Sequence, residues 1–134
     1  MATALIQGEL TESVIGAFYQ VYNTLGYGLL EPLYSAALAI ELRARGHQVD
    51  REIRSPVEYR GQRIGWQRLD LVVNHRLIVE LKATEVLAPH ARRQLLSYLT
   101  ATGIEVGLLL HFGPKARLFR VVHSHPSQVS APPP

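Results

Sequence analysis

The chain of 134 residues has no cysteine, one tryptophan and one methionine. The lack of cysteine excludes a disulfide framework and thiolate-bound zinc or iron–sulfur clusters. No run approaches the roughly 18 apolar residues that a membrane-spanning helix needs. Residues 1–9 also lack the basic and apolar stretches of a secretory signal. We therefore expect a cytoplasmic protein without a membrane partner.

Lysine and aspartate are also scarce, with two of each: Lys82, Lys115, Asp50 and Asp70. Arginine supplies the other 12 basic residues, and the formal net charge is +3. The guanidinium fork suits phosphate oxygens, so this bias favours contact with nucleic acid. Genome composition explains an arginine bias equally well. The bias alone therefore leaves the partner open.

The length suits one domain, and 47% hydrophobic residues are enough to build a core. We expect a single domain over residues 1–122. Residues 123–134 contain four prolines in their last nine positions, so we expect them to form a flexible, Pro-rich C-terminal tail.

Hydrophobic periodicity predicts a mixed α+β fold of the α/β type, with a sheet flanked by helices. Thr11 is the expected N-cap of the first helix, and Gly46 and Gly103 are expected to end the second and third. The apolar run 106–112 predicts a central strand. The run 35–40, apolar nearly all round, predicts either deep burial or a dimer contact. The expected helices are 11–25, 30–45 and 89–102, and the expected strands are 47–54, 56–59, 64–73, 77–81, 106–112 and 117–122.

The strands 64–73 and 77–81 are predicted to form a hairpin through the short loop 74–76. If Val73 pairs with Leu77, Asp70 lies opposite Glu80, and both side chains project from one face. Lys82 shares that face because side chains alternate along a strand. The opposite, apolar face then consists of Leu69, Leu71, Val73, Leu77, Val79 and Leu81. A slip of one residue in the pairing would destroy this cluster.

Two facing carboxylates repel each other unless a cation neutralises them. Mg²⁺ binds one or two carboxylates, keeps several waters and contacts substrate phosphates. Lys82 would add a fixed positive charge beside the reacting phosphate. The cluster therefore suits metal-dependent hydrolysis of a phosphodiester. An ion network on a solvated sheet face is the commoner explanation of a bare Glu-X-Lys, but the flanking strands here are apolar. Glycoside hydrolysis by two carboxylates leaves Lys82 without a role.

Five short motifs occur in an order that resembles the GxxExxY family of the PD-(D/E)XK nuclease-like superfamily. They extend over most of residues 11–122. The motifs are GLLEPLY (28–34), RLD (68–70), ELKA (80–83), QLLSYL (94–99) and GLLLHFG (107–113). The resemblance implies a restriction-endonuclease-like core, with a central mixed sheet and flanking helices.

The resemblance also implies roles for individual residues. Asp70 and Glu80 correspond to the metal-binding acids, and Glu31 to an acid on a helix that helps to hold the metal. Lys82 corresponds to the catalytic lysine, and Gln94 to a glutamine beside the site. Two features depart from the family pattern: His111 replaces the usual asparagine before Phe-Gly, and no proline precedes Asp70. Neither departure removes a charged position of the signature.

Five further residues are candidate substrate contacts: Tyr34, Arg68, His90, Arg93 and Tyr98. Tyr34 and Tyr98 lie one helical turn beyond Glu31 and Gln94, and each is equally well explained as a packed core residue. His90 could contact phosphate or cap the third helix. The arginines flank the predicted site in sequence and could contact a nucleic-acid backbone, although solubility explains them nearly as well.

These observations predict a nuclease that depends on Mg²⁺ or Mn²⁺ and hydrolyses phosphodiester bonds in nucleic acid. We expect DNA as the substrate in preference to RNA. A minimal domain needs a way to grip its substrate, and a homodimer would supply one. The alternative is a non-catalytic binding or interaction module with the same fold, in which the charged cluster is only an ion network.

Overall fold

The computed structural model describes residues 6–124, which form three helices and one five-stranded sheet. Strands β3 and β4 are parallel, and the other neighbouring pairs are antiparallel. The mixed α+β class expected from the sequence is therefore confirmed. The elements are α1 (Gly8–Leu25), α2 (Glu31–Ala44), β1 (Val49–Tyr59), β2 (Gln62–Val73), β3 (Leu77–Lys82), α3 (Ala91–Thr102), β4 (Val106–Phe112) and β5 (Ala116–Val122).

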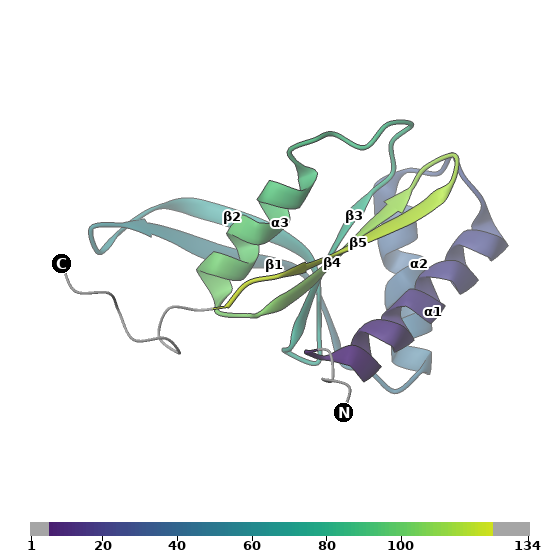
Figure 1. The fold of residues 1–134 in the computed structure, drawn as a ribbon, viewed down its shortest axis with the longest axis horizontal. Helices are drawn as coiled ribbons and strands as arrows, with labels where there is room; N and C mark the ends of the chain where they lie inside the picture. Colours follow the sequence, from purple (N-terminus) through teal and green to yellow (C-terminus); the bar gives the residue numbers. More distant parts are fainter. Residues whose placement is uncertain (1–5, 125–134) are drawn as a thin grey trace, which may run out of the picture.

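The sheet has the order β1-β2-β3-β4-β5 and carries a hydrophobic cluster on each face. Helices α1 and α2 pack on one face, and α3 packs on the other (Figure 1). Alternation along β3 divides its residues between the clusters, with Val79 in the first and Ile78 in the second. The sheet is thus covered on both sides, as the apolar character of β3 and β4 requires.

All seven residues of β4 are buried, but the prediction that β4 is the central strand is wrong. The central position belongs to β3. The connection through α3 places β4 beside β3, and the final hairpin then adds β5 outside β4. A strand that is buried on both faces and paired on both sides is apolar whether or not it is central.

The two N-terminal helices differ from expectation mainly at their ends. Helix α1 begins at Gly8, so Thr11 is not its N-cap; the Thr11 hydroxyl instead donates a hydrogen bond to the Gly8 carbonyl at 3.0 Å. Helix α2 ends before Gly46, whose φ of 88° suits glycine. The expected deep burial of residues 35–40 fails at Ile40, which is 69% exposed.

Strand β1 is continuous through Pro56, so the prediction of two strands, 47–54 and 56–59, is wrong. Proline is tolerated here because β1 is an edge strand, where its missing N–H breaks no outer ladder bond. Beyond the sheet, β1 and β2 continue as a two-stranded ribbon (Figure 1). The pairing shifts register between Val57 and Glu58, as in a β-bulge.

The hairpin between β2 and β3 has the predicted loop and register. Asn74 and His75 have positive φ values of 53° and 57°, and Val73 pairs with Leu77. Helix α3 begins at Ala91, two residues later than predicted, and Gly103 ends it with a φ of 82°. No helix within residues 6–124 is long and apolar enough to cross a membrane. The expected tail lies outside the described residues from position 125 onward.

Candidate active site at the fork between β2 and β3

The strands β2 and β3 separate at Asp70, and we call this place the fork. The last ladder pair is Leu71 with Val79, so Asp70 and Glu80 are not a backbone pair. Instead, the Leu81 N–H donates a hydrogen bond of 2.9 Å to Asp70 Oδ2. The carboxylate takes the place of a strand carbonyl and satisfies a backbone donor that would otherwise lose its partner. This bond fixes the Asp70 side chain in the gap between the strands.

The neighbouring backbone is irregular at the same level of the sheet. Glu52 of β1 has a φ of 53°, and the β1–β2 ladder passes from Arg51–Leu71 to Ile53–Leu69 without pairing it. Leu69 belongs to the hydrophobic cluster on the α3 side, whereas Leu71 belongs to the opposite one. The prediction that both line one apolar face is therefore wrong, because strict alternation does not hold across this irregularity.

Glu80 lies beside Asp70 and is almost completely buried, with 3% of its surface exposed. Burial, then a hydrogen bond with the Asp70 carboxyl and the charge on that group, raise the pKa of Glu80 to about 9. The charge of Lys82 acts in the opposite direction. Without a cation, therefore, this pair of acids retains a proton at neutral pH, as expected of like charges in close contact.

Glu31 approaches the pair from the first turn of α2, with Pro32 as the next helical residue. Burial, followed by the charge of Asp70, raises the pKa of the Glu31 carboxyl. The charges of Lys82 and Arg68 lower it. These effects require the four charged groups to lie within electrostatic range. Glu31 on α2 therefore lies within electrostatic range of Asp70 on β2 and Glu80 on β3.

Helix α3 supplies polar side chains from the other side of the fork. Lys82 Nζ donates a hydrogen bond to Gln94 Oε1 at 3.3 Å. Tyr98, one turn beyond Gln94, is buried, and its hydroxyl is hydrogen-bonded to the Glu80 carboxyl. Burial, then the charge of Glu80 and that hydrogen bond, raise the pKa of Tyr98. Tyr98 therefore holds one of the acids in addition to packing in the core.

The remaining candidate residues occupy different surroundings. Tyr34 is fully buried and stacks on Phe112 with a centroid separation of 4.2 Å. Its hydroxyl donates to the Gly26 carbonyl and accepts a hydrogen bond from the Leu29 N–H, so its packing favours the core alternative. Arg68 is exposed beside the acids.

His90 and Arg93 lie at the exposed start of α3. His90 occupies the N-cap position of α3, as the capping alternative expects, but its side chain forms no capping hydrogen bond. Arg93 lines a hollow between α3 and the ribbon. Neither residue contributes to the pKa shifts of Glu31 or Glu80. The structure therefore does not join them to the group at the fork.

His111 is a neighbour of the site that was not selected from the sequence. It pairs with Lys82 across β3 and β4 and is 4% exposed, and its Nε2 lies 2.7 Å from the Thr84 carbonyl oxygen. In the sequence, the only indication that His111 lies near the site was that it stands where the resembled family usually has asparagine. A Cβ on Gly113 would lie 2.6 Å from the His111 ring, which explains the glycine.

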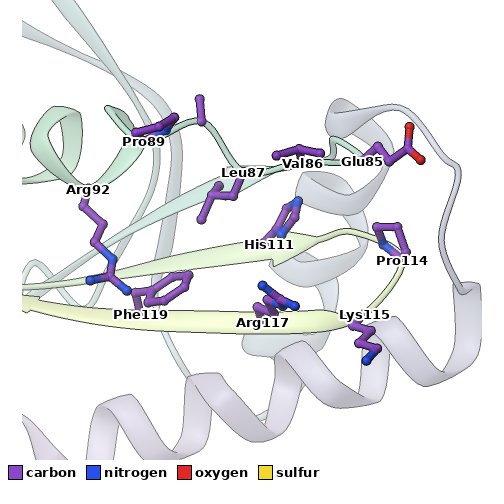
Figure 2. A pocket seen from close by; sticks show the side chains of 11 residues that line it. Glu85, Val86, Leu87, Pro89, Arg92, His111, Pro114, Lys115, Arg117 and Phe119 are labelled. Carbon is purple, nitrogen blue, oxygen red and sulfur yellow. The ribbon is translucent and has the colours of Figure 1, made fainter.

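A hollow of about 640 Å³ opens beside His111, between the loop after β3 and strand β5 (Figure 2). Arg92 stands over the Phe119 ring at 3.8 Å, and the Arg117 side chain projects from β5 (Figure 2). None of the three acids lines this hollow. Its lining residues are Glu85, Val86, Leu87, Ala88, Pro89, Arg92, His111, Pro114, Lys115, Arg117 and Phe119.

The donor set at the fork fits a divalent cation. Among residues 6–124, no three Asp, Glu or His side chains already form a complete group of metal ligands. Mg²⁺ does not need one, because it binds through one or two carboxylates and retains several waters. Asp70 and Glu80 are two carboxyls in hydrogen-bond contact whose full ionisation requires a nearby positive charge.

Comparison with known proteins agrees with this fold. The family model described as the PD-(D/E)XK nuclease superfamily matches residues 8–121, and the chain therefore belongs to that superfamily. No curated protein matches the chain. A solved structure titled "Crystal structure of SSO0001" is similar at 18% identity and a TM-score of 0.57, over 91% of this chain. The match covers 61% of that solved chain and supports the fold alone.

Proposed function

We propose that this protein is a nuclease that uses Mg²⁺ or Mn²⁺ to hydrolyse phosphodiester bonds in nucleic acid. The observation that supports the proposal is that Glu80 is buried beside Asp70, with Glu31 and Lys82 within electrostatic range. Membership of a nuclease superfamily supports the same reaction class. The motif GLLEPLY at residues 28–34 places Glu31 at the start of α2, and on that basis we assign the chain to the GxxExxY family within the superfamily.

In this proposal, Asp70 and Glu80 hold the cation, and Glu31 assists directly or through water. The bound ion would orient the scissile phosphate, lower the pKa of a water molecule and stabilise developing negative charge. Glu80 would hold the ion in its deprotonated form, because the positive charge of the ion would compensate that of the carboxylate. Tyr98 then donates a hydrogen bond to the ionised Glu80 and keeps it oriented.

Lys82 has a separate role beside the carboxylates. Its ammonium group donates hydrogen bonds to the attacking water or to a phosphate oxygen, where it stabilises charge in the transition state. Gln94 accepts one hydrogen bond from this group at 3.3 Å and limits its orientations. Lys82 and Gln94 therefore form a pair in which the glutamine positions the lysine.

Nucleic acid is the substrate class of the superfamily, and we propose DNA in preference to RNA. Arg68 lies beside the acids and provides one cation for the backbone. A homodimer remains our proposal for extending the contact area. We base it on Ile40, which is 69% exposed at the end of the apolar segment 35–40.

Cleavage by a matched pair of lysine variants tests the nuclease proposal. We expect Lys82→Ala to lower the cleavage rate by about 100-fold or more, since removing one preorganised transition-state donor has this effect. Lys115→Ala is the control, because Lys115 is the other lysine in the chain and is exposed. The assay uses DNA and RNA with Mg²⁺, Mn²⁺ or EDTA. Equal cleavage by the two variants, or full activity in EDTA, would contradict the proposal.

The second candidate is a non-catalytic binding module with the same fold. The observation that favours it is that the pKa of Glu80 is raised to about 9, so that a protonated Glu80 can hydrogen-bond the Asp70 carboxyl without a metal. Such a module should be indifferent to divalent cations, and no variant at the fork should change its response to them. The nuclease, in contrast, gains stability when Mn²⁺ binds the folded state.

A further inference from the structure

The β1–β2 ribbon extends beyond the rest of the sheet. Strand β3 pairs with β2 only over residues 71–73 of β2, so the part of β2 before Leu69 is paired with β1 as its single neighbouring strand. The result is a two-stranded arm over residues 54–68, visible to the left of α3 in Figure 1. A long exposed ribbon presents unpaired edges, and natural proteins that keep one protect it with charge or give it a function.

The arm carries a concentrated positive charge. Residues 54–68 contain Arg54, Arg60, Arg63 and Arg68 and a single acid, Glu58. Their net charge of +3 equals that of the whole chain. All four arginines are exposed. The formal charges outside the arm cancel one another, so the net positive charge of the molecule lies on the arm.

Two of these arginines are ordered by the tryptophan. The guanidinium groups of Arg54 and Arg63 lie over the Trp66 ring at 4.4 and 4.7 Å from its centroid. Such contacts hold the guanidinium groups in place before a ligand arrives, which lowers the entropy lost on binding. They also occupy the π surface of Trp66, which is 44% exposed. The ring is thus a support for cations and a poor platform for stacking bases.

The arm has one face toward α3 and one face away from it. On the first, Gln67 Nε2 donates a hydrogen bond to Ser97 Oγ of α3 at 2.9 Å. On the second, the cross-strand pairs Arg54–Arg68 and Pro56–Trp66 place Arg54, Trp66 and Arg68 together. Arg68 also lowers the pKa of Glu31, so the second face ends beside the acids of the fork.

We propose that Arg54, Arg63, Trp66 and Arg68, here called the ribbon track, bind the phosphate backbone of duplex DNA and lead it to the fork. This inference rests on the proposed nuclease function. A two-stranded ribbon fits the major groove of B-DNA, whereas the corresponding groove of A-form RNA is too narrow. The engaged Trp66 ring argues against single strands, which bind through stacked bases. A second copy that docked on the ribbon track through its own arm would bring an equal positive charge and be repelled there.

Binding of fluorescent DNA to the full chain tests the ribbon track. Titrations in EDTA, which prevents cleavage, compare a short DNA duplex with its single strand and with an RNA duplex over a series of salt concentrations. The test variant is Arg54→Ala with Arg63→Ala. The control is Arg45→Ala with Arg76→Ala, which removes the same charge from exposed sites outside the arm. Equal melting temperatures exclude unfolding as the cause of any difference.

We expect the test variant to bind the duplex about tenfold more weakly or worse. The plot of the logarithm of its binding constant against the logarithm of the salt concentration should be less steep by about 2, because each phosphate contact contributes about 0.9 to that slope. The control should retain the wild-type slope. Replacement of both arginines by lysine should restore the slope, since lysine keeps the charge.

The inference is overturned if the test and control variants bind equally, or if the wild type prefers single-stranded DNA or RNA duplex. It is also overturned if the test variant changes only the oligomeric state in sedimentation. If the ribbon variants lose DNA binding but the wild type cleaves nothing with any metal, the ribbon track stands and the nuclease proposal fails. If cleavage depends on Lys82 but the ribbon variants bind and cleave DNA like the wild type, the nuclease proposal stands and the ribbon track fails.

Discussion

Glu80 is the residue on which the site depends most, because it is an acid in a place where ionisation is unfavourable. Its pKa of about 9 in the folded protein compares with 4.5 in an unfolded chain. Below about pH 4.5 the group is protonated in both states. Between these two values the unfolded chain releases a proton that the folded protein keeps. The free energy of unfolding therefore falls as the pH rises through this window.

The Glu80→Gln variant should reverse this loss in metal-free protein. Glutamine is uncharged in both states and similar in size, so it removes the cost of protonating Glu80 when the chain folds in this pH window. We expect its melting temperature at pH 8 to exceed that of the wild type by several degrees, since about 1 kcal/mol shifts the midpoint by roughly 2–8 °C in chains of this size. At pH 5 the difference should be much smaller.

The control for this variant is Glu85→Gln, which changes an exposed glutamate in the loop after β3. Its melting temperature should follow the wild type at both pH values. Thermal unfolding in the presence of EDTA measures all three proteins. A lower melting temperature for Glu80→Gln than for the wild type at pH 8 would refute the assignment of Glu80 as a buried, protonated acid.

At the scale of the elements, the contact between α3 and β4 positions Gln94 and Tyr98 over the sheet. Gly107 of β4 is in tight contact with α3, because a Cβ there would lie 2.8 Å from the Leu95 side chain. Gly107→Ala should therefore overpack this contact and lower stability by about 1–3 kcal/mol. Denaturant unfolding measures the change.

Gly65→Ala is the matched control for this prediction. Gly65 also lies in a strand, and a Cβ there would meet no atom within 4 Å. This variant should be neutral or slightly stabilising, because alanine restricts the unfolded chain more than glycine does. Equal destabilisation by the two variants would contradict a tight α3–β4 contact.

The sequence predicts these elements well where the pattern is local. The loop 74–76, the register of Val73 with Leu77 and the end of α3 at Gly103 follow from turn residues and alternation. Local patterns do not predict that β1 runs through Pro56 as one strand, because the tolerance for proline depends on which strand forms the sheet edge. That information belongs to the whole sheet.

At the scale of the whole molecule, some features of the candidate site follow from local sequence patterns and others depend on the folded sheet. The placement of Asp70 near Glu80 follows from hairpin register, and the addition of Glu31 came from resemblance to a family. The fork itself could not be predicted, because the bond from the Leu81 N–H to Asp70 replaces a ladder bond that alternation assumes. The ribbon track was missed because Arg63 reaches Trp66 across a bulge that breaks the period of two.

The central claim is that Asp70 and Glu80 hold a divalent cation together, and direct titration with Mn²⁺ tests it. We expect the wild type to bind one ion at the fork and to release a proton from Glu80, so that its affinity rises by up to about tenfold per pH unit below pH 9. Asp70→Asn should lose this binding. Asp50→Asn should retain it, because Asp50 is the other aspartate in the chain, lies beside His75 and makes no contribution to the pKa shift of Glu80. Equal binding of Mn²⁺ by the two variants, or its absence from the wild type, would contradict the claim.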